Sequence, residues 1–213
     1  MSDKIKVMLV DDHAVVRAGY QMLLKSSPEI DVVAEANSGE EAYRLHGLHE
    51  IDVIVMDLSL PGIGGIEAIK RIHARDNKTK VLVFSMHEEI IFVEQSLQAG
   101  ASGYITKSTD PQLLVEAIKR LSRGEKYIDP ELAQRLAYEK SRGQDSPLSD
   151  FSTREFEIFC MLAEGLNTSE VAKRLSLSYK TVANYSTQIK TKLDVATVAD
   201  IARIAIRYNI IQA

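Results

Sequence analysis

The sequence predicts an α/β fold in two parts: a doubly wound parallel (βα)5 sheet with strand order 2-1-3-4-5, then a four-helix, all-α domain with a helix-turn-helix. In residues 1–125, short apolar runs alternate with segments of helical spacing, whereas residues 151–213 show helical spacing only. We interpret residues 126–150 as a linker between these two domains. Within it, Asp129–Arg142 is compatible with a polar helix, and Gly143–Asp150 has the composition of a loop.

Five apolar runs of the first domain are predicted strands. They are rich in Val and Ile and nearly continuous, as strands buried on both faces are. The runs are Ile5–Val10, Val32–Ala36, Ile51–Met56, Val81–Ser85 and Gly103–Thr106. Five βα units of this length imply a parallel sheet with helices on both faces.

Helical segments separate these strands. Their apolar residues recur every three or four positions, which is typical of helices that pack one face against a sheet. The clearest segments are Val16–Leu24, Ile66–Ile72 and Leu113–Leu121. Ser38-Gly-Glu-Glu41 has the pattern of a capping box, which predicts that the second helix begins there.

The second domain contains four predicted helices. Polar residues that favour helix starts precede each apolar pattern, namely Ser152, Asn167, Ser178 and Thr197. Only a few residues around Leu177 separate the second helix from the third, which predicts a helix-turn-helix.

Length and composition are those of an ordinary folded protein. The 213 residues are 45% apolar and 26% charged, which excludes a disordered chain, a collagen-like repeat and a disulfide scaffold. No apolar run approaches the roughly 18 residues that span a bilayer, so we expect no membrane partner. Cys160 is the single cysteine and we assign it to core packing, so a reduced cytoplasmic location is the simplest expectation. The net charge of −4 divides into −6 for residues 1–150 and +2 for residues 151–213.

Three aspartates follow two of the predicted strands. Asp11 and Asp12 come directly after the first strand, and Asp57 follows the third. In a sheet of order 2-1-3-4-5 these strands are neighbours, so the carboxylates converge where doubly wound folds bind ligands. Because carboxylates this close repel each other without a cation, we expect Mg²⁺, which prefers oxygen ligands. The alternative for an isolated Asp-Asp pair is a polar loop with a helix cap.

Two more polar residues end strands at the same edge of the sheet. Ser85 closes the fourth strand and Lys107 follows the fifth. An ammonium group and a hydroxyl beside the carboxylates suit an incoming phosphoryl group, since the lysine offsets its charge and the hydroxyl donates to an oxygen. Asp57 can then be the nucleophile. Alone, either residue would be structural, and the prediction depends on all five residues occupying strand ends.

Motifs around these residues resemble the receiver domain of bacterial response regulators over residues 4–124. The motifs are VDDH at Val10–His13, MDLSLPGIGGIE at Met56–Glu67, VFSMH at Val83–His87 and GASGYITK at Gly100–Lys107. The resemblance implies that a partner histidine kinase phosphorylates Asp57. It also implies that Asp12 ligates Mg²⁺ directly, Asp11 largely through water, and Ser59 through its main-chain carbonyl.

The same resemblance implies a phosphate partner, Lys107, and a switch pair, Ser85 and Tyr104. A phosphoryl group on Asp57 would attract the Ser85 hydroxyl and vacate space into which the Tyr104 ring can rotate. Met86 is bulkier than the Ala or Gly common at its position in receivers. We expect it to restrict water and slow dephosphorylation.

The third predicted helix of the second domain has a polar face opposite its apolar one. Val182 and Ile189 mark the apolar face. The polar face carries Lys180, Ala183, Asn184, Thr187, Gln188 and Thr191. Such a face is usually only solvated. After a short helix and a tight turn, it is typical of a recognition helix that enters the major groove of DNA.

The segment from Phe151 to Leu193 resembles the LuxR/FixJ/NarL-type helix-turn-helix. The residues that carry the similarity include Arg154-Glu155, Ala163-Glu164-Gly165, Glu170-Val171-Ala172 and Lys180-Thr181-Val182. The resemblance implies that Ala183, Asn184 and Thr187 face bases, with Lys180 and Lys190 near phosphates. The expected DNA-contacting set is Lys180, Thr181, Ala183, Asn184, Thr187, Gln188 and Lys190.

Within that family, PGIGGIE and KTVANY are most similar to the GacA/UvrY group. The sequence departs from the family at Tyr179, where Pro or Glu is common, and at Ser186, where that group has Arg. The helix therefore carries less positive charge than its relatives, which predicts weak nonspecific affinity for DNA.

A single module of charge +2 is a poor binder of DNA, and two modules on neighbouring promoter half-sites double the contacts. Members of this family dimerise through the fourth helix. We therefore expect a homodimer on phosphorylation and predict that this helix exposes Val198, Ile201, Ala202 and Ala205. The alternative is that these side chains only close the bundle.

Together these observations predict a transcriptional response regulator that is not an enzyme. An aspartate-dependent phosphatase is the main alternative, but it needs a second aspartate two residues after the nucleophile, where this chain has Ser59. The other alternative is a DNA-binding protein that works without phosphorylation and uses its receiver only to dimerise.

Overall fold

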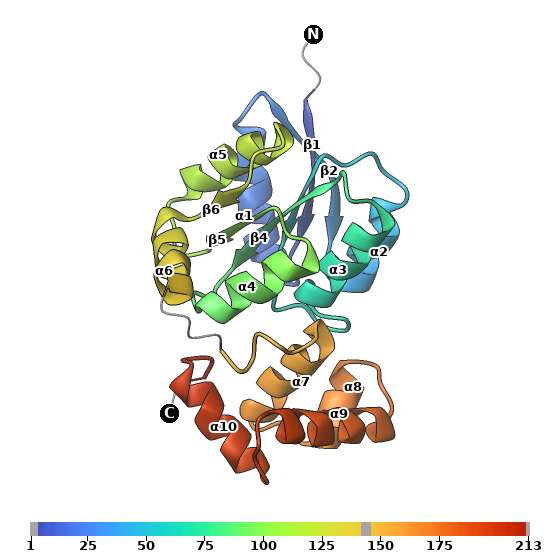
Figure 1. Cartoon of the computed structure of the whole chain (residues 1–213). Coiled ribbons are helices and arrows are strands. Elements are labelled where there is room, and N and C mark those ends of the chain that lie inside the picture. The colour runs from blue at the N-terminus through green and yellow to red at the C-terminus, as the bar shows by residue number, and fades with distance from the viewer. Residues whose placement is uncertain (1–3, 142–145, 212–213) are drawn as a thin grey trace. The chain divides into compact units, whose positions relative to one another are not determined.

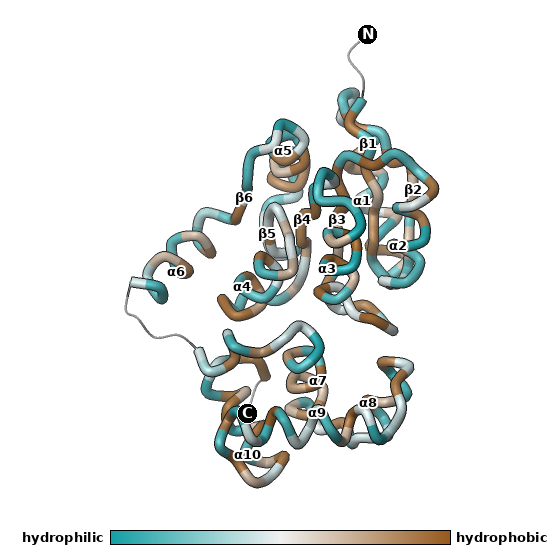
Figure 2. The backbone as a smooth tube through the Cα atoms, turned by 45° about the vertical axis from the view of Figure 1, so that its right-hand side comes forward, coloured by the Kyte–Doolittle hydropathy of each residue, from teal (hydrophilic) through white to brown (hydrophobic). Residues whose placement is uncertain are grey.

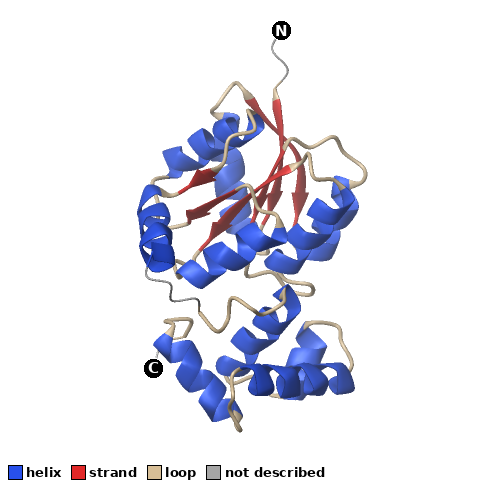
Figure 3. Ribbon diagram, in the orientation of Figure 1, coloured by secondary structure: helices blue, strands red, loops and turns tan. Residues whose placement is uncertain are grey.

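The computed structural model of the chain describes residues 4–141 and 146–211. They form two compact units that divide between Tyr138 and Glu139, the first an α/β unit and the second all-helical (Figures 1 and 3). Part of the predicted linker, at 142–145, lies outside the described residues, as do the chain ends at 1–3 and 212–213. Within the described ranges, no helix is long and apolar enough to cross a membrane.

The first unit is built on a parallel sheet with strand order β2-β1-β3-β4-β5-β6. The strands are β1 (Ile5–Val10), β2 (Ile30–Ala36), β3 (Val53–Met56), β4 (Lys80–Ser85), β5 (Gly103–Thr106) and β6 (Tyr127–Ile128). The predicted order of the first five strands is confirmed. Val10 pairs with Met56, and Ser85 pairs with Thr106, so the residues that follow these strands emerge at one edge of the sheet.

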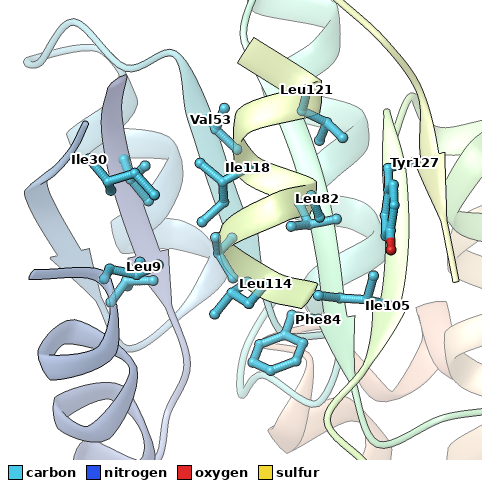
Figure 4. Packing of buried hydrophobic residues seen from close by; sticks show 14 residues of the cluster. Leu9, Ile30, Val53, Leu82, Phe84, Ile105, Leu114, Ile118, Leu121 and Tyr127 are labelled. Atoms are coloured by element: carbon cyan, nitrogen blue, oxygen red, sulfur yellow. The ribbon is translucent and has the colours of Figure 1, made fainter. Parts of the chain in front are cut away.

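Helices cover both faces of the sheet, as predicted. They are α1 (Ala14–Lys25), α2 (Gly39–His46), α3 (Gly65–Arg75), α4 (Ile90–Ala99) and α5 (Pro111–Ser122). Helices α1 and α5 lie on one face, and α2, α3 and α4 lie on the other (Figure 1). On the first face, Leu9, Val53 and Leu82 of the strands pack with Leu114 and Ile118 of α5 (Figure 4). The core strands β3 and β4 are mainly hydrophobic along their length (Figure 2).

The sixth strand has only two residues, so the sequence pattern does not reveal it. Tyr127 pairs with Gly103, and Ile128 pairs with Tyr104. The Tyr127 ring joins the core cluster of the sheet (Figure 4). Two residues that the sequence analysis placed in the linker are therefore part of the sheet. Helix α6 (Pro130–Ser141) follows, close to the polar helix expected at 129–142.

The start of α2 differs in detail from the prediction. The Ser38 hydroxyl accepts a hydrogen bond from the amide of Glu41, as expected. The Glu41 carboxylate, however, accepts from the amide of Asn37 rather than from that of Ser38. Only half of the predicted capping box forms, because the carboxylate reaches the amide one residue earlier in the chain.

The second unit has the four predicted helices: α7 (Thr153–Ala163), α8 (Thr168–Arg174), α9 (Tyr179–Lys192) and α10 (Val198–Arg207). Ser152, Asn167 and Thr197 form complete capping boxes, and the Ser178 hydroxyl accepts from the amide of Thr181. Only residues 175–178 separate α8 from α9, so the predicted helix-turn-helix is present.

Candidate functional site

The ends of β1 and β3 bring four polar side chains together. The amide of Asp57 donates to the carbonyl of Val10 at 2.9 Å, which sets the two strand ends side by side. Ligand atoms of Asp11, Asp12, His13 and Asp57 all lie within 4.8 Å of one another. Asp11 and Asp57 are buried, whereas Asp12 is exposed.

Lys107 joins this cluster from the end of β5. Its Nζ lies 2.7 Å from Oδ2 of Asp11 and 2.7 Å from Oδ2 of Asp57. Burial opposes the charged ammonium, but hydrogen bonds to the two carboxylates outweigh it and raise the pKa of Lys107. The structure therefore unites these three residues from separate strands, and the lysine is positively charged at neutral pH.

The donor set fits a hard divalent cation. Three carboxylates, of Asp11, Asp12 and Asp57, supply oxygen ligands, which Mg²⁺ prefers. His13 Nδ1 lies 2.8 Å from Oδ1 of Asp12 and 3.5 Å from Oδ1 of Asp11. The partly open side of the cluster at Asp12 leaves room for the waters that Mg²⁺ usually retains.

Helix α9 presents the predicted polar face to solvent. Its apolar side, Val182 and Ile189, is fully buried. The expected DNA-contacting residues that are exposed are Lys180, Asn184, Thr187 and Gln188, and those that are half-buried are Thr181, Ala183 and Lys190. Ser186 is 8% exposed, so this position lies on the buried side of the helix rather than on the polar face.

An ion pair ties the end of α9 to the start of α7. Lys192 Nζ lies 2.7 Å from Oε2 of Glu155, and the same carboxylate accepts from the amide of Ser152. Burial disfavours the ionised Glu155, but these hydrogen bonds outweigh it and hold its pKa below the ordinary value. The contact fixes α9 relative to the rest of the second unit.

Two family models match the chain. The model described as response regulator receiver domain matches residues 7–119, and that of the bacterial regulatory proteins of the luxR family matches residues 149–205. The chain belongs to the LuxR-type response regulators. These are DNA-binding regulators of transcription rather than enzymes, and the two models correspond to the α/β unit and the helical unit.

Known LuxR-type response regulators match nearly the whole chain. Response regulator UvrY of Escherichia coli (strain K12) is 36% identical over 98% of this chain and 97% of its own. Response regulator GacA of Pseudomonas aeruginosa is 36% identical over 98% of this chain and 99% of its own, which confirms the predicted resemblance to this group. A structure of RcsB from Salmonella enterica serovar Typhimurium, bound to promoter P1flhDC in the presence of phosphomimetic BeF3−, is 25% identical and covers 95% of this chain and 98% of that one, with a TM-score of 0.72.

His87 connects the residues expected to form the receiver switch. Its amide donates to the hydroxyl of the fully buried Ser85 at 3.3 Å, and its carbonyl accepts from the Tyr104 hydroxyl at 2.9 Å. Tyr104 is fully buried, and burial raises its pKa. His87 Nε2 also lies 3.5 Å from Oγ of Ser59, whose amide donates to Oδ1 of Asp57 at 3.3 Å. Sequence reasoning assigned no role to His87, although the VFSMH motif contains it.

Helix α1 contributes two residues that the sequence analysis also missed. Arg17 Nη1 donates to the carbonyl of Asp11 at 2.6 Å, and Tyr20 packs edge to face on Phe84. Together with Asp57 they line a cavity of about 10 Å³, close to the size that one water occupies. The only signal in the sequence was helical spacing, which places Arg17 on the turn of α1 nearest the site.

Helix α10 corrects part of the predicted dimer surface. Ile201 and Ala205 are fully buried, so the expectation that the helix exposes them is wrong. They close the bundle instead, because α10 packs this side against α7. Val198 is 41% exposed and Ala202 is half-buried, so these two remain available at the surface of this unit.

Proposed function

We propose that this response regulator is a transcription factor switched by Mg²⁺-dependent phosphorylation of Asp57. The observation that carries the proposal is the position of Lys107, whose ammonium bridges Asp11 and Asp57 at 2.7 Å from each carboxylate. A cation at this point reduces the repulsion between Asp57 and an incoming phosphoryl group. The donor is the phosphohistidine of a sensor histidine kinase, the class of partner that a receiver domain implies.

In the transfer, an oxygen of Asp57 bonds to phosphorus as the phosphorus–nitrogen bond of the phosphohistidine breaks, and the leaving imidazole nitrogen takes up a proton. The Ser59 amide orients the nucleophile through Oδ1 of Asp57. Lys107, whose raised pKa keeps it charged, exchanges Asp57 for a phosphoryl oxygen. Mg²⁺ bound by Asp11, Asp12, Asp57 and the Ser59 carbonyl would neutralise charge on the phosphoryl oxygens.

The switch pair responds through His87. A phosphoryl oxygen offers the Ser85 hydroxyl a stronger acceptor than its present surroundings. Because the amide of His87 is bonded to Ser85 and its carbonyl to Tyr104, movement of Ser85 toward the phosphoryl group changes the support of the tyrosine hydroxyl. A change from mostly inactive to mostly active requires roughly 3–5 kcal/mol of differential stabilisation.

The output of the switch is DNA binding through α9. Asn184, Thr187 and Gln188 are exposed on one face with Lys180 near its start, as base-reading and phosphate-contacting residues of a recognition helix are. Thr181, Ala183 and Lys190 complete the proposed contact set. Phosphorylation promotes a homodimer on two promoter half-sites, with Val198 and Ala202 of α10 at the interface. A kinase partner and a DNA target place this activity in the cytoplasm.

The first test is phosphorylation by acetyl phosphate and Mg²⁺ of the full chain, of Asp57→Asn and of Asp31→Asn. Asp31 is an exposed aspartate of β2 and serves as the matched control. We expect intact mass to rise by one phosphoryl group in the parent and in Asp31→Asn only, with a dimer detected by light scattering. If the parent gains no phosphoryl group while a known receiver does, the proposal fails and regulation without phosphorylation takes its place.

The second test concerns the DNA surface. Fluorescence anisotropy with a DNA site selected from random sequence should show that Lys180→Ala lowers the slope of log affinity against log salt by about one unit. Asn184→Ala should instead relax the choice of base at one position. Lys126→Ala, at an exposed lysine of the first unit, is the control and should change neither. Unchanged binding in both α9 variants would refute this surface.

A further inference from the structure

We propose that Arg17 is a positioning residue for the metal and phosphoryl site, because it fixes the turn that carries Asp11 and Asp12. The inference rests on the proposed function, in which these aspartates hold Mg²⁺. Arg17 lies at the end of the first turn of α1 and makes no contact with a reacting atom. It acts through the main chain of Asp11.

The Arg17 guanidinium donates hydrogen bonds to two partners. Its Nη1 donates to the carbonyl of Asp11 at 2.6 Å, and its Nε donates to Oε2 of Glu35 at 3.0 Å. Gln21 Nε2 donates to the other oxygen of that carboxylate at 2.6 Å. The arginine side chain is 18% exposed, so it is held between β2 and the turn after β1. Because the guanidinium group is planar and rigid, it loses little conformational entropy for each hydrogen bond that it forms.

The turn after β1 is held at several atoms: the amide of Asp11 donates to the carbonyl of Ala36 at 3.2 Å, and Arg17 holds the carbonyl of Asp11. The N-cap residue of α1, His13, makes no side-chain capping hydrogen bond. Asp11 is fixed at its carboxylate by the amide of His13 and by Lys107, each at 2.7 Å, and at its carbonyl by Arg17. Asp12 directly follows that carbonyl, so the plane of the peptide that Arg17 holds also sets the direction of the Asp12 side chain.

Loss of Arg17 would therefore weaken the binding of the metal without removing a ligand. Residues that orient metal ligands typically change metal affinity by 10–100-fold when they are mutated. For Arg17→Ala we expect a Mg²⁺ dissociation constant about tenfold higher than that of the parent. Arg17→Lys should recover part of the loss, since an ammonium can still donate to the Asp11 carbonyl but not to both partners.

The experiment measures Mg²⁺ affinity of the unphosphorylated full chain by calorimetric titration. The amide signal of His13 in nitrogen-15 NMR spectra, which reports the Asp11 carboxylate, localises the effect. Gln21→Ala is the matched control, because it removes a bond to Glu35 and leaves the Asp11 carbonyl contact intact. We expect Gln21→Ala to bind Mg²⁺ within about twofold of the parent.

The proposal is overturned if Arg17→Ala binds Mg²⁺ as tightly as the parent and only its melting temperature is lower. Arg17 would then stabilise the fold without positioning the metal ligands. If Arg17→Ala does not fold, the Mg²⁺ affinity of Arg17→Lys decides in the same way, and parent affinity there overturns the proposal. A parent that binds Mg²⁺ but gains no phosphoryl group refutes the proposed function while the role of Arg17 in metal binding is still decided by these titrations.

Discussion

Replacing Lys107 with methionine removes the ammonium group and keeps most of the side-chain volume. In the parent, Nζ lies 2.7 Å from both Asp11 and Asp57, and the three side chains are 10% exposed or less. Two buried carboxylates then face each other without a cation between them. The variant isolates the electrostatic part of the site from its packing.

The expected loss of stability follows from this burial. Removing one partner of a buried ion pair costs about 3–5 kcal/mol, because the remaining charge is unpaired. The exposed neighbour Asp12 shows that water reaches one side of the cluster, so we expect about 3 kcal/mol. With an unfolding entropy of about 2.1 cal/mol/K per residue, the first unit, residues 1–138, should melt about 10 °C lower.

The pH dependence has a definite sign. The pKa of Lys107 is raised in the folded protein, so its stabilising contribution is fully present below the unfolded pKa near 10.4 and is lost as pH rises through the folded value. The difference in melting temperature between the parent and Lys107→Met should therefore be the same at pH 7 as at pH 9. Added Mg²⁺ should stabilise the variant more than the parent, because the metal supplies the missing positive charge.

Differential scanning calorimetry of the full chain is the assay, with the receiver transition assigned by its response to Mg²⁺. Lys119→Met is the matched control, since Lys119 pairs with Glu29 on the surface and exposed pairs contribute little. If the melting temperature of Lys107→Met falls no further than that of Lys119→Met, the claim that a buried cation holds the site together is refuted.

Three further predictions concern the switch, the helical unit and the phosphoryl lifetime. Tyr104→Phe loses the bond to the His87 carbonyl and should lower the free energy of unfolding by about 1 kcal/mol in urea titrations, so an unchanged value would contradict the contact. Because the pKa of Glu155 is lowered, its stabilisation is present above the unfolded value of about 4.5 and is lost as pH falls through the folded value. Glu155→Gln should flatten this acid dependence of the melting temperature, and an equally steep loss would count against the ion pair. Met86 directly follows Ser85 and is 68% exposed, and we expect it to shield the phosphoryl group from water. Met86→Ala should then shorten the phosphoryl half-life about threefold, which corresponds to about 0.7 kcal/mol in the barrier, and an equal half-life would reject this role.

The sheet could be predicted because its strands are long enough to show their own pattern. Val53–Met56 and the other core strands are continuous apolar runs, and the order 2-1-3-4-5 is a common one for doubly wound folds. Tyr127–Ile128 has two residues, and only the facing edge of β5 makes it a strand. In helix α10 the pattern is visible but ambiguous. Ile201 and Val198 are both apolar, and periodicity alone does not tell that the bundle buries Ile201 and leaves Val198 exposed.

The acidic site could be predicted for a related reason. The carboxyl ends of neighbouring parallel strands must meet, so Asp11, Asp57 and Lys107 were placed together by strand order alone. Which atoms touch was beyond that reasoning. The Ser85 hydroxyl faces the amide of His87 because of the course of the chain after β4, which has no period in the sequence.

Three of the contacts that sequence reasoning missed join a side chain to the main chain of another residue. Arg17 binds the carbonyl of Asp11, Tyr104 binds the carbonyl of His87, and the amide of His87 binds Ser85. Every residue has a main-chain carbonyl, so the sequence does not indicate which carbonyl accepts the hydrogen bond. A main-chain carbonyl is kept by every substitution, however, and it moves only when the backbone moves. These contacts are therefore suited to couple side-chain chemistry at Asp57 to backbone position, which a receiver must change to alter its surface.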